Sequence, residues 1–248
     1  MENGNNFKIY GGRNPRELPM YPLDWAARLL LLPKSTLKAW VFGSQWFETA
    51  SRRYREFFPL IEPPSPNEHM LSFVNLVEAH VLKSIRRKHL VRMEKVRAGL
   101  TILRKSHPET NHPLADIDLL AGGRDFFRKE YGILLNLSMG EQVAMDFLEV
   151  YLSRVERNPQ GLANKLFPFT ALPLKVGRKV IEQDGKVIAI DPFVSFGKPI
   201  INGTGIPTDA IADRFRGGDS IETLCEEFDL PSIKIQYAIR YEEAQLAN

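Results

Sequence analysis

The chain has 248 residues, more than one typical domain of about 100–200, so its length predicts two compact units or three small ones. Hydrophobic residues make up 44% and charged residues 25%, a balance that excludes wholesale disorder. The net charge of +3 hides an asymmetry, because residues 178–248 carry 8 basic and 12 acidic side chains and residues 1–177 carry 25 and 18. A basic excess upstream predicts nucleic-acid binding by the first part of the chain.

A single cysteine, Cys225, excludes an intramolecular disulfide and a cysteine-based metal site, and we expect it to be a small core residue. Residues 1–10 lack the apolar core of a signal peptide, and the longest clean apolar run, residues 29–32, is too short to cross a membrane. We therefore expect a cytoplasmic protein without membrane contact.

Residues 1–20 form a polar arm that we expect to be flexible. Behind it, a helix beginning near Pro22 and a second one over residues 33–42, ended by Gly43, predict a helix-turn-helix. The apolar spacing turns Lys34, Ser35 and Lys38 outward, although any helical hairpin fits this periodicity as well.

Two extended segments, residues 46–48 and 52–58, follow around a polar turn and predict a wing. Arg52, Arg53 and Arg55 would then reach DNA phosphates beside the second helix. A basic run is more often a solvated face, but its place beside a helix-turn-helix favours binding.

Two amphipathic helices are predicted next, one from Leu71 to about Lys88 and one from Met93. Residues 81–105 contain nine basic side chains and one acid, Glu94. Residues 21–105 resemble the MerR-type winged-helix DNA-binding domain in the order of these segments. Within the same basic run, we assign Arg86 and Arg87 to DNA binding.

The middle segment, residues 106–177, is predicted to be a linker or dimerisation segment. Residues 125–138 suggest a hairpin, and residues 139–155 suggest a helix with a wide apolar face. That face suits either core packing or the interface of a homodimer, which would present two symmetric readers to paired DNA half-sites.

Asp184-Gly185, between the β-rich runs 178–183 and 186–190, predicts a hairpin, since both turn residues tolerate positive φ. Three helices follow, over residues 208–216, 220–228 and 231–244. The last two form a second helix-turn-helix candidate.

The run from Ile190 to Thr208 (IDPFVSFGKPIINGTGIPT) resembles the signature of a small domain in VapB-like antitoxins, here over residues 181–245. The resemblance implies a long, multidomain antitoxin, encoded beside a PIN-type nuclease toxin. Gly205 departs from the pattern, which commonly has arginine there. The loop is either architectural or binds a partner, and the residues concerned are Phe196, Gly197, Lys198, Pro199, Gly203, Thr204, Ile206 and Pro207.

Catalytic chemistry is weakly represented. A metal site from His107, His112, Asp116 and Asp118 matches no common zinc spacing. The chain contains neither a phosphate-binding loop with a Gly-Lys-Ser/Thr ending nor a nucleophile elbow. We therefore expect no catalytic residue, metal or cofactor, and no enzyme activity.

Together these patterns predict a predominantly helical α+β protein with three parts after the arm. These are a winged helix-turn-helix (21–105), a mixed middle segment (106–177) and a β-hairpin with a three-helix unit (178–248). The predicted function is an antitoxin that neutralises a cognate PIN-type ribonuclease and represses its own operon by binding operator DNA. The alternative is a MerR-like regulator that senses a small ligand.

Overall fold

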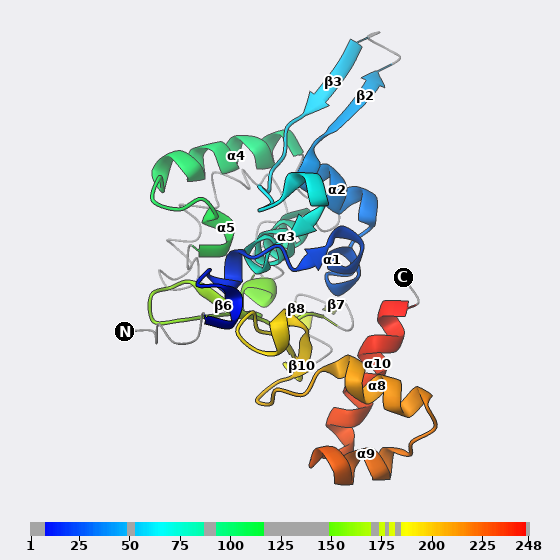
Figure 1. The fold of residues 1–248 in the computed structure, drawn as a ribbon. Helices are drawn as coiled ribbons and strands as arrows, with labels where there is room; N and C mark the ends of the chain where they lie inside the picture. Colours follow the sequence, from blue (N-terminus) through cyan, green and yellow to red (C-terminus); the bar gives the residue numbers. More distant parts are fainter. Residues whose placement is uncertain are drawn as a thin grey trace.

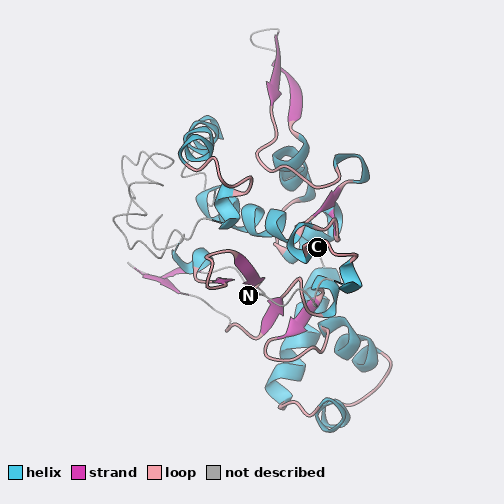
Figure 2. Cartoon of the chain, turned by 60° about the vertical axis from the view of Figure 1, so that its left-hand side comes forward, coloured by secondary structure: helices cyan, strands magenta, loops and turns pink. Residues whose placement is uncertain are grey.

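The computed structural model describes residues 8–48, 53–86, 93–116, 149–169, 174–176, 179–181 and 185–246. Helices and strands mix along the chain in an α+β fold, as predicted (Figures 1 and 2). The described α-helices are α1 (Leu23–Leu29), α2 (Lys34–Phe42), α3 (Phe73–Arg86), α4 (Met93–Ser106), α5 (Pro113–Asp116), α8 (Thr208–Arg216), α9 (Ile221–Phe228) and α10 (Ser232–Leu246).

The described strands form small antiparallel sheets. They are β1 (Tyr21–Pro22) with β4 (Met70–Leu71), β2 (Ser44–Glu48) with β3 (Arg53–Phe57), β7 (Leu174–Val176) with β8 (Lys179–Ile181), and a four-stranded sheet in the order β10 (Pro199–Ile201), β9 (Ile188–Ile190), β6 (Ala163–Leu166) and β5 (Val155–Arg157). Short 3-10 turns occur at η1 (Lys8–Tyr10), η2 (Pro15–Glu17), η3 (Pro66–Glu68) and η5 (Ser195–Gly197).

Helix α3 lies at the centre of the N-terminal body, with α1, α2, α4 and α5 around it (Figure 1). Every residue from Phe73 to Ser84 is buried, so this part of the helix is covered on all sides. Burial of this kind stabilises the fold by about 25 cal/mol for each Å² of apolar surface removed from water. The apolar periodicity therefore predicted α3 and α4 correctly.

One core cluster joins residues from Tyr21 near the N-terminus to Tyr241 in α10. The predicted domain limits at residues 20, 105 and 177 stay a prediction, and the core contains residues on both sides of the last one.

The predicted flexible arm is wrong for residues 8–20. Tyr10 is buried and its hydroxyl donates to the Pro192 carbonyl at 3.1 Å. Arg16 is buried as well, pairs with the Asp116 carboxylate, and donates to the Ala163 carbonyl at 2.6 Å. The arm is fixed because its polar side chains find partners far away in the sequence.

The hairpin predicted around Asp184-Gly185 is also wrong. Strand β8 pairs with β7, whereas β9 pairs with β10 and, through Leu166 and Ile190, with β6. The turn signal reports only local sequence, whereas β9, with all three residues buried, pairs on one side with the following strand β10 and on the other with the distant strand β6.

The helix predicted over residues 139–155 was extended too far at its C-terminal end. Only its end is described, where the helix stops at Leu152 and Val155 begins strand β5. Tyr151, Leu152 and Val155 are buried in this chain, so these three positions belong to the core and not to a subunit interface. The hairpin predicted over residues 125–138 lies outside the described residues.

The three C-terminal helices are confirmed and form a unit at the opposite end of the molecule from the β2–β3 hairpin (Figures 1 and 2). Ser220 caps α9 by accepting from the Thr223 backbone N–H. Asp229, in the left-handed conformation at φ 51°, ends α9 and directs the chain into α10. Arg214 of α8 pairs with Asp219 and Glu227, which ties α8 to α9.

Candidate nucleic-acid interface

Helices α1 and α2 pack against each other through small and apolar side chains, Ala26 and Ala27 in α1 and Leu37 and Val41 in α2, all buried. The tight turn between them passes through Leu31, which has a positive φ of 49°. Lys83 from α3 donates to the Leu30 carbonyl at 2.5 Å, which satisfies an otherwise unpaired carbonyl at the end of α1. The helix pair is thus positioned by α3.

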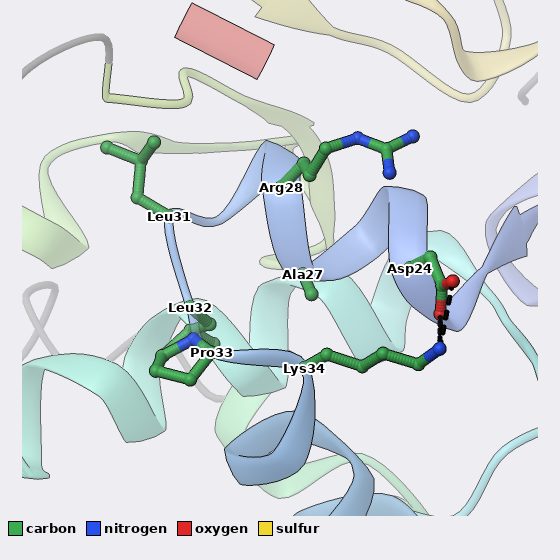
Figure 3. A pocket seen from close by; sticks show the side chains of 7 residues that line it. All are labelled: Asp24, Ala27, Arg28, Leu31, Leu32, Pro33 and Lys34. Atoms are coloured by element: carbon green, nitrogen blue, oxygen red, sulfur yellow. Dashed lines mark hydrogen bonds and ion pairs between the residues drawn. The ribbon is translucent and has the colours of Figure 1, made fainter. Parts of the chain in front are cut away.

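The outer face of α2 carries the three residues predicted to enter a DNA groove. Lys34, Ser35 and Lys38 are all exposed. The Lys34 ammonium lies 2.8 Å from the Asp24 carboxylate of α1 (Figure 3). Since both side chains are more than half exposed, this ion pair is weak and salt-screened, and a phosphate could replace Asp24 as the partner of Lys34.

A pocket of about 390 Å³ opens where α1 turns into α2. Figure 3 shows its lining, with the Lys34 side chain directed to Asp24 and no interaction drawn between Arg28 and either residue. The lining residues are Asp24, Ala27, Arg28, Leu31, Leu32, Pro33 and Lys34. A second pocket, of about 360 Å³, lies beside it and includes Lys38. Both pockets thus border the exposed cations of α2.

The two extended segments predicted to form a wing pair as the hairpin β2–β3, which projects far from the body (Figures 1 and 2). Its base is fixed, because the Leu60 and Ile61 N–H groups donate to the Trp40 carbonyl at 2.7 and 3.1 Å. Gly43 is required at the junction, where a Cβ would lie 2.4 Å from the Phe57 carbonyl oxygen.

The basic residues predicted on the wing are only partly described. Arg53 lies on β3 opposite Glu48, and Arg55 lies opposite Trp46. Arg52 lies outside the described residues. The same holds for Arg87, whereas Arg86 is the last residue of α3.

Two arginines of α4 have a role that the sequence did not indicate. The Arg97 guanidinium donates to the Phe58 carbonyl and lies 5.3 Å from the centre of the Phe57 ring. Arg104 donates to the Leu60 carbonyl at 2.8 Å. The charge bias of residues 81–105 suggested DNA contact, but these two side chains donate to the segment that follows β3.

A histidine and a buried carboxylate join α3 to α5. His112 Nδ1 lies 3.1 Å from Glu78 Oε2, and the Asn75 amide donates to the same oxygen at 3.2 Å. Burial raises the pKa of Glu78, against the lowering effect of His112 and Asn75. Burial would lower the pKa of His112, but the hydrogen bond and charge of Glu78 prevail, with Asp116 adding to them, and raise it. This pair of groups is therefore a structural tie.

The residues considered as metal ligands from the sequence form pairs with other side chains. His107 pairs with Glu109, and Asp116 pairs with Arg16. Within the described ranges, no three histidine, cysteine or acidic side chains gather as a metal site would require. Asp118 lies outside these ranges.

The 196–207 loop closes mainly on itself and on the body. Ile201 N donates to the Ile206 carbonyl at 3.0 Å, and the Thr204 hydroxyl donates to the Ile201 carbonyl at 2.8 Å. Gly203 has a φ of 82°, Pro207 precedes α8, and Pro199 begins β10. Lys198 pairs with Asp209 at 2.7 Å. Several of the predicted loop residues therefore make contacts within the loop or with α8.

Gly197 and Phe196 are neighbours in the same loop but differ in their exposure to solvent. Gly197, at φ 72°, is buried beneath Tyr21, whose hydroxyl donates to the Gly197 carbonyl at 3.0 Å. Phe196 is 64% exposed.

Cys225 is half-buried against the core, as expected for a small core residue.

Comparison with known proteins gives matches to a family model, a curated relative and a solved structure. Residues 188–241 match the model of a family described as a protein of unknown function (DUF433). The chain is 23% identical over 239 residues to "Putative antitoxin VapB45" from Mycobacterium tuberculosis, covering 90% of this chain and 93% of that protein. A solved structure, the X-ray crystal structure of Rv2018 from Mycobacterium tuberculosis, matches with a TM-score of 0.64 and 22% identity, over 90% of this chain and 98% of that one.

These matches support an antitoxin-like protein. The likeness to the Rv2018 structure shows a shared fold over nearly the whole chain. The DUF433 segment begins at β9 and ends within α10, so it contains the loop, α8, α9 and most of α10. No described helix of this antitoxin-like chain is both long and apolar enough to span a membrane.

Proposed function

We propose that this protein is a cytoplasmic antitoxin that neutralises a PIN-type ribonuclease and represses its own operon by binding operator DNA. The observation that carries the proposal is the similarity, over 90% of the chain, to the protein named "Putative antitoxin VapB45". The N-terminal helix pair and its projecting hairpin support the DNA-binding half, and the acidic C-terminal unit supports the toxin-binding half.

In the DNA-binding half, α2 enters the major groove and presents Lys34, Ser35 and Lys38. The hairpin contacts the backbone through Arg52, Arg53 and Arg55, and Arg86 and Arg87 extend the basic surface. Together these parts act as a winged helix-turn-helix. A homodimer would supply the two readers that a palindromic operator requires.

In the toxin-binding half, residues 178–248 carry 12 acids against 8 bases. This charge complements the basic RNA-binding surface of a nuclease, so the antitoxin would block access of its RNA substrate. No catalytic group of this chain takes part.

The deciding experiment is a rescue of growth. The gene next to this one is expressed alone and then together with this one, with an empty vector as control. We expect arrest of growth in the first case and relief in the second. Arrest without relief, or no arrest, would contradict the antitoxin role and favour a regulator that senses a small ligand.

DNA binding is tested separately by titrating the purified protein with its own promoter at several salt concentrations. Lys38→Ala should weaken binding and reduce the slope of log K against log salt by about 1, because one phosphate contact is lost. Lys234→Ala, a change in α10 at the far end of the chain, is the matched control and should leave this slope unchanged.

A further inference from the structure

The turn η5 contains three consecutive residues with left-handed backbones. Ser195, Phe196 and Gly197 have φ values of 47°, 54° and 72°. Glycine adopts this conformation freely, but each residue with a side chain pays roughly 1–2 kcal/mol for it. A bulky aromatic residue is an uncommon choice at such a position.

Contacts on both sides hold the turn in this conformation. The Ser195 hydroxyl donates to the Gly205 carbonyl at 2.7 Å, and Tyr21 donates to the Gly197 carbonyl at 3.0 Å. A Cβ on Gly197 would lie 2.2 Å from the Tyr21 hydroxyl oxygen, so the turn is packed tightly against the N-terminal body. The surrounding structure therefore imposes the strain, as is common where backbone geometry serves a function.

The side chain displayed by this turn contributes little to the core. Phe196 is 64% exposed and meets the edge of the Tyr10 ring, with 5.7 Å between ring centres. Ile9, the neighbour of Tyr10, is 71% exposed. Two large exposed apolar side chains are thus connected to one buried tyrosine, Phe196 through its ring contact and Ile9 as the preceding residue in the chain.

The charges around Phe196 indicate what its partner offers. Lys198, two residues along, is neutralised by Asp209 of α8, and Asp213 and Glu242 lie near enough to affect its electrostatics. Residues 178–248 as a whole carry four more acids than bases. The partner surface that fits is therefore an apolar pocket bordered by basic side chains.

We infer that Phe196, supported by Ile9, is the aromatic anchor that inserts into an apolar pocket of the toxin. This inference rests on the proposed function and assigns its contact point. An anchor that is already fixed in its bound conformation loses little entropy on binding, which explains why a strained backbone is retained here. Exposed aromatic residues are frequent among those that dominate binding energy.

The test measures binding and folding together in the full-length protein. The probe is the purified product of the neighbouring gene, titrated against wild type, Phe196→Gly and Ile233→Ala. The last variant removes another exposed apolar side chain, 56% exposed and located in α10. We expect Phe196→Gly to weaken binding at least about tenfold, and Ile233→Ala to leave it unchanged.

The melting temperature separates a contact role from a structural one. Because glycine accepts a left-handed backbone, Phe196→Gly should leave Tm unchanged or raise it by up to about 4 °C. Unchanged toxin affinity, or a clear fall in Tm, would overturn the inference. Conversion of a dimer to a monomer by Phe196→Gly, measured by light scattering, would overturn it in favour of a second copy as the occupant. A wild-type protein that does not bind the probe would reject the proposed function itself, and this inference with it.

Discussion

Two glycines of the C-terminal loop share a left-handed backbone but differ in their surroundings. A Cβ on Gly197 would meet the Tyr21 hydroxyl, whereas a Cβ on Gly203, at φ 82°, would have no atom within 4 Å. Gly203→Ala should therefore cost only backbone strain, about 1 kcal/mol. Gly197→Ala should cost about 1–3 kcal/mol more, because it overpacks a buried contact. Urea unfolding of both variants measures the difference, and equal losses would contradict the packing against Tyr21.

A buried histidine gives the molecule a predictable response to acid. His80 Nε2 donates to the Tyr151 carbonyl at 2.9 Å, in a site it shares with the Phe169 ring. Burial lowers the pKa of His80 from 6.5 to about 3, and the positive charges of Lys83 and Arg154 act in the same direction.

This pKa shift determines how stability depends on pH. As the pH falls, His80 binds a proton near pH 6.5 in the unfolded chain but only near pH 3 in the folded chain. The contribution of His80 is therefore complete above pH 6.5 and is lost as the pH falls, by up to about 1.4 kcal/mol for each unit. His80→Gln, which keeps an N–H donor, should remove this part of the slope below pH 6.5 and run parallel to wild type above it. Identical slopes in urea unfolding at pH 4–6 would contradict the prediction.

Among the elements, helix α4 acts as a support for the hairpin. Arg97 and Arg104 donate to backbone carbonyls just after β3, and no DNA contact is needed to explain their position. Arg97→Ala should therefore lower DNA affinity by allowing the hairpin to move, while the salt dependence of binding keeps its wild-type slope. Arg97→Lys, which retains an N–H donor, should restore part of the affinity. A slope reduced by about 1 in Arg97→Ala would show instead that Arg97 contacts phosphate.

The elements also show which features a sequence can predict. Gly43 and Ser220 mark helix ends through local chemistry, so α2 and α9 were predicted within a residue or two. Strand partners are not local. β9 pairs with β6, which lies more than twenty residues upstream, and the Asp184-Gly185 turn signal contained no information about this competition.

In the candidate site, too, the features that depend on local sequence were predictable and those that depend on distant contacts were not. The outward direction of Lys34, Ser35 and Lys38 followed from helical periodicity, because a single buried face fixes the exposed one. The roles of Arg97 and Gly197 were not predictable, because each depends on a contact with a residue distant in the sequence. Composition showed a basic run but could not separate the arginines that support the hairpin from those proposed to contact DNA.

At the scale of the whole molecule, the C-terminal unit depends on the rest of the chain. β6 completes the sheet beside β9, and Tyr21 and Tyr10 donate to carbonyls of the 192–197 segment. A fragment of residues 178–248 loses all three contacts. We expect it to show poorly dispersed amide signals in NMR spectra, and the full chain to be well dispersed. A fragment with native-like dispersion would contradict this dependence.

Tyr21 connects the helix pair proposed to bind DNA with the turn proposed to bind the toxin. It leads directly into α1, stacks on Trp25, and donates to the turn that displays Phe196. A toxin bound to this turn would act, through one hydrogen bond, on the first helix of the pair proposed to bind DNA. By thermodynamic linkage, any factor by which the toxin changes the affinity for the operator is the factor by which the operator changes the affinity for the toxin. Tyr21→Phe, which removes the hydroxyl and keeps the ring, would then uncouple the two ligands while each still binds alone.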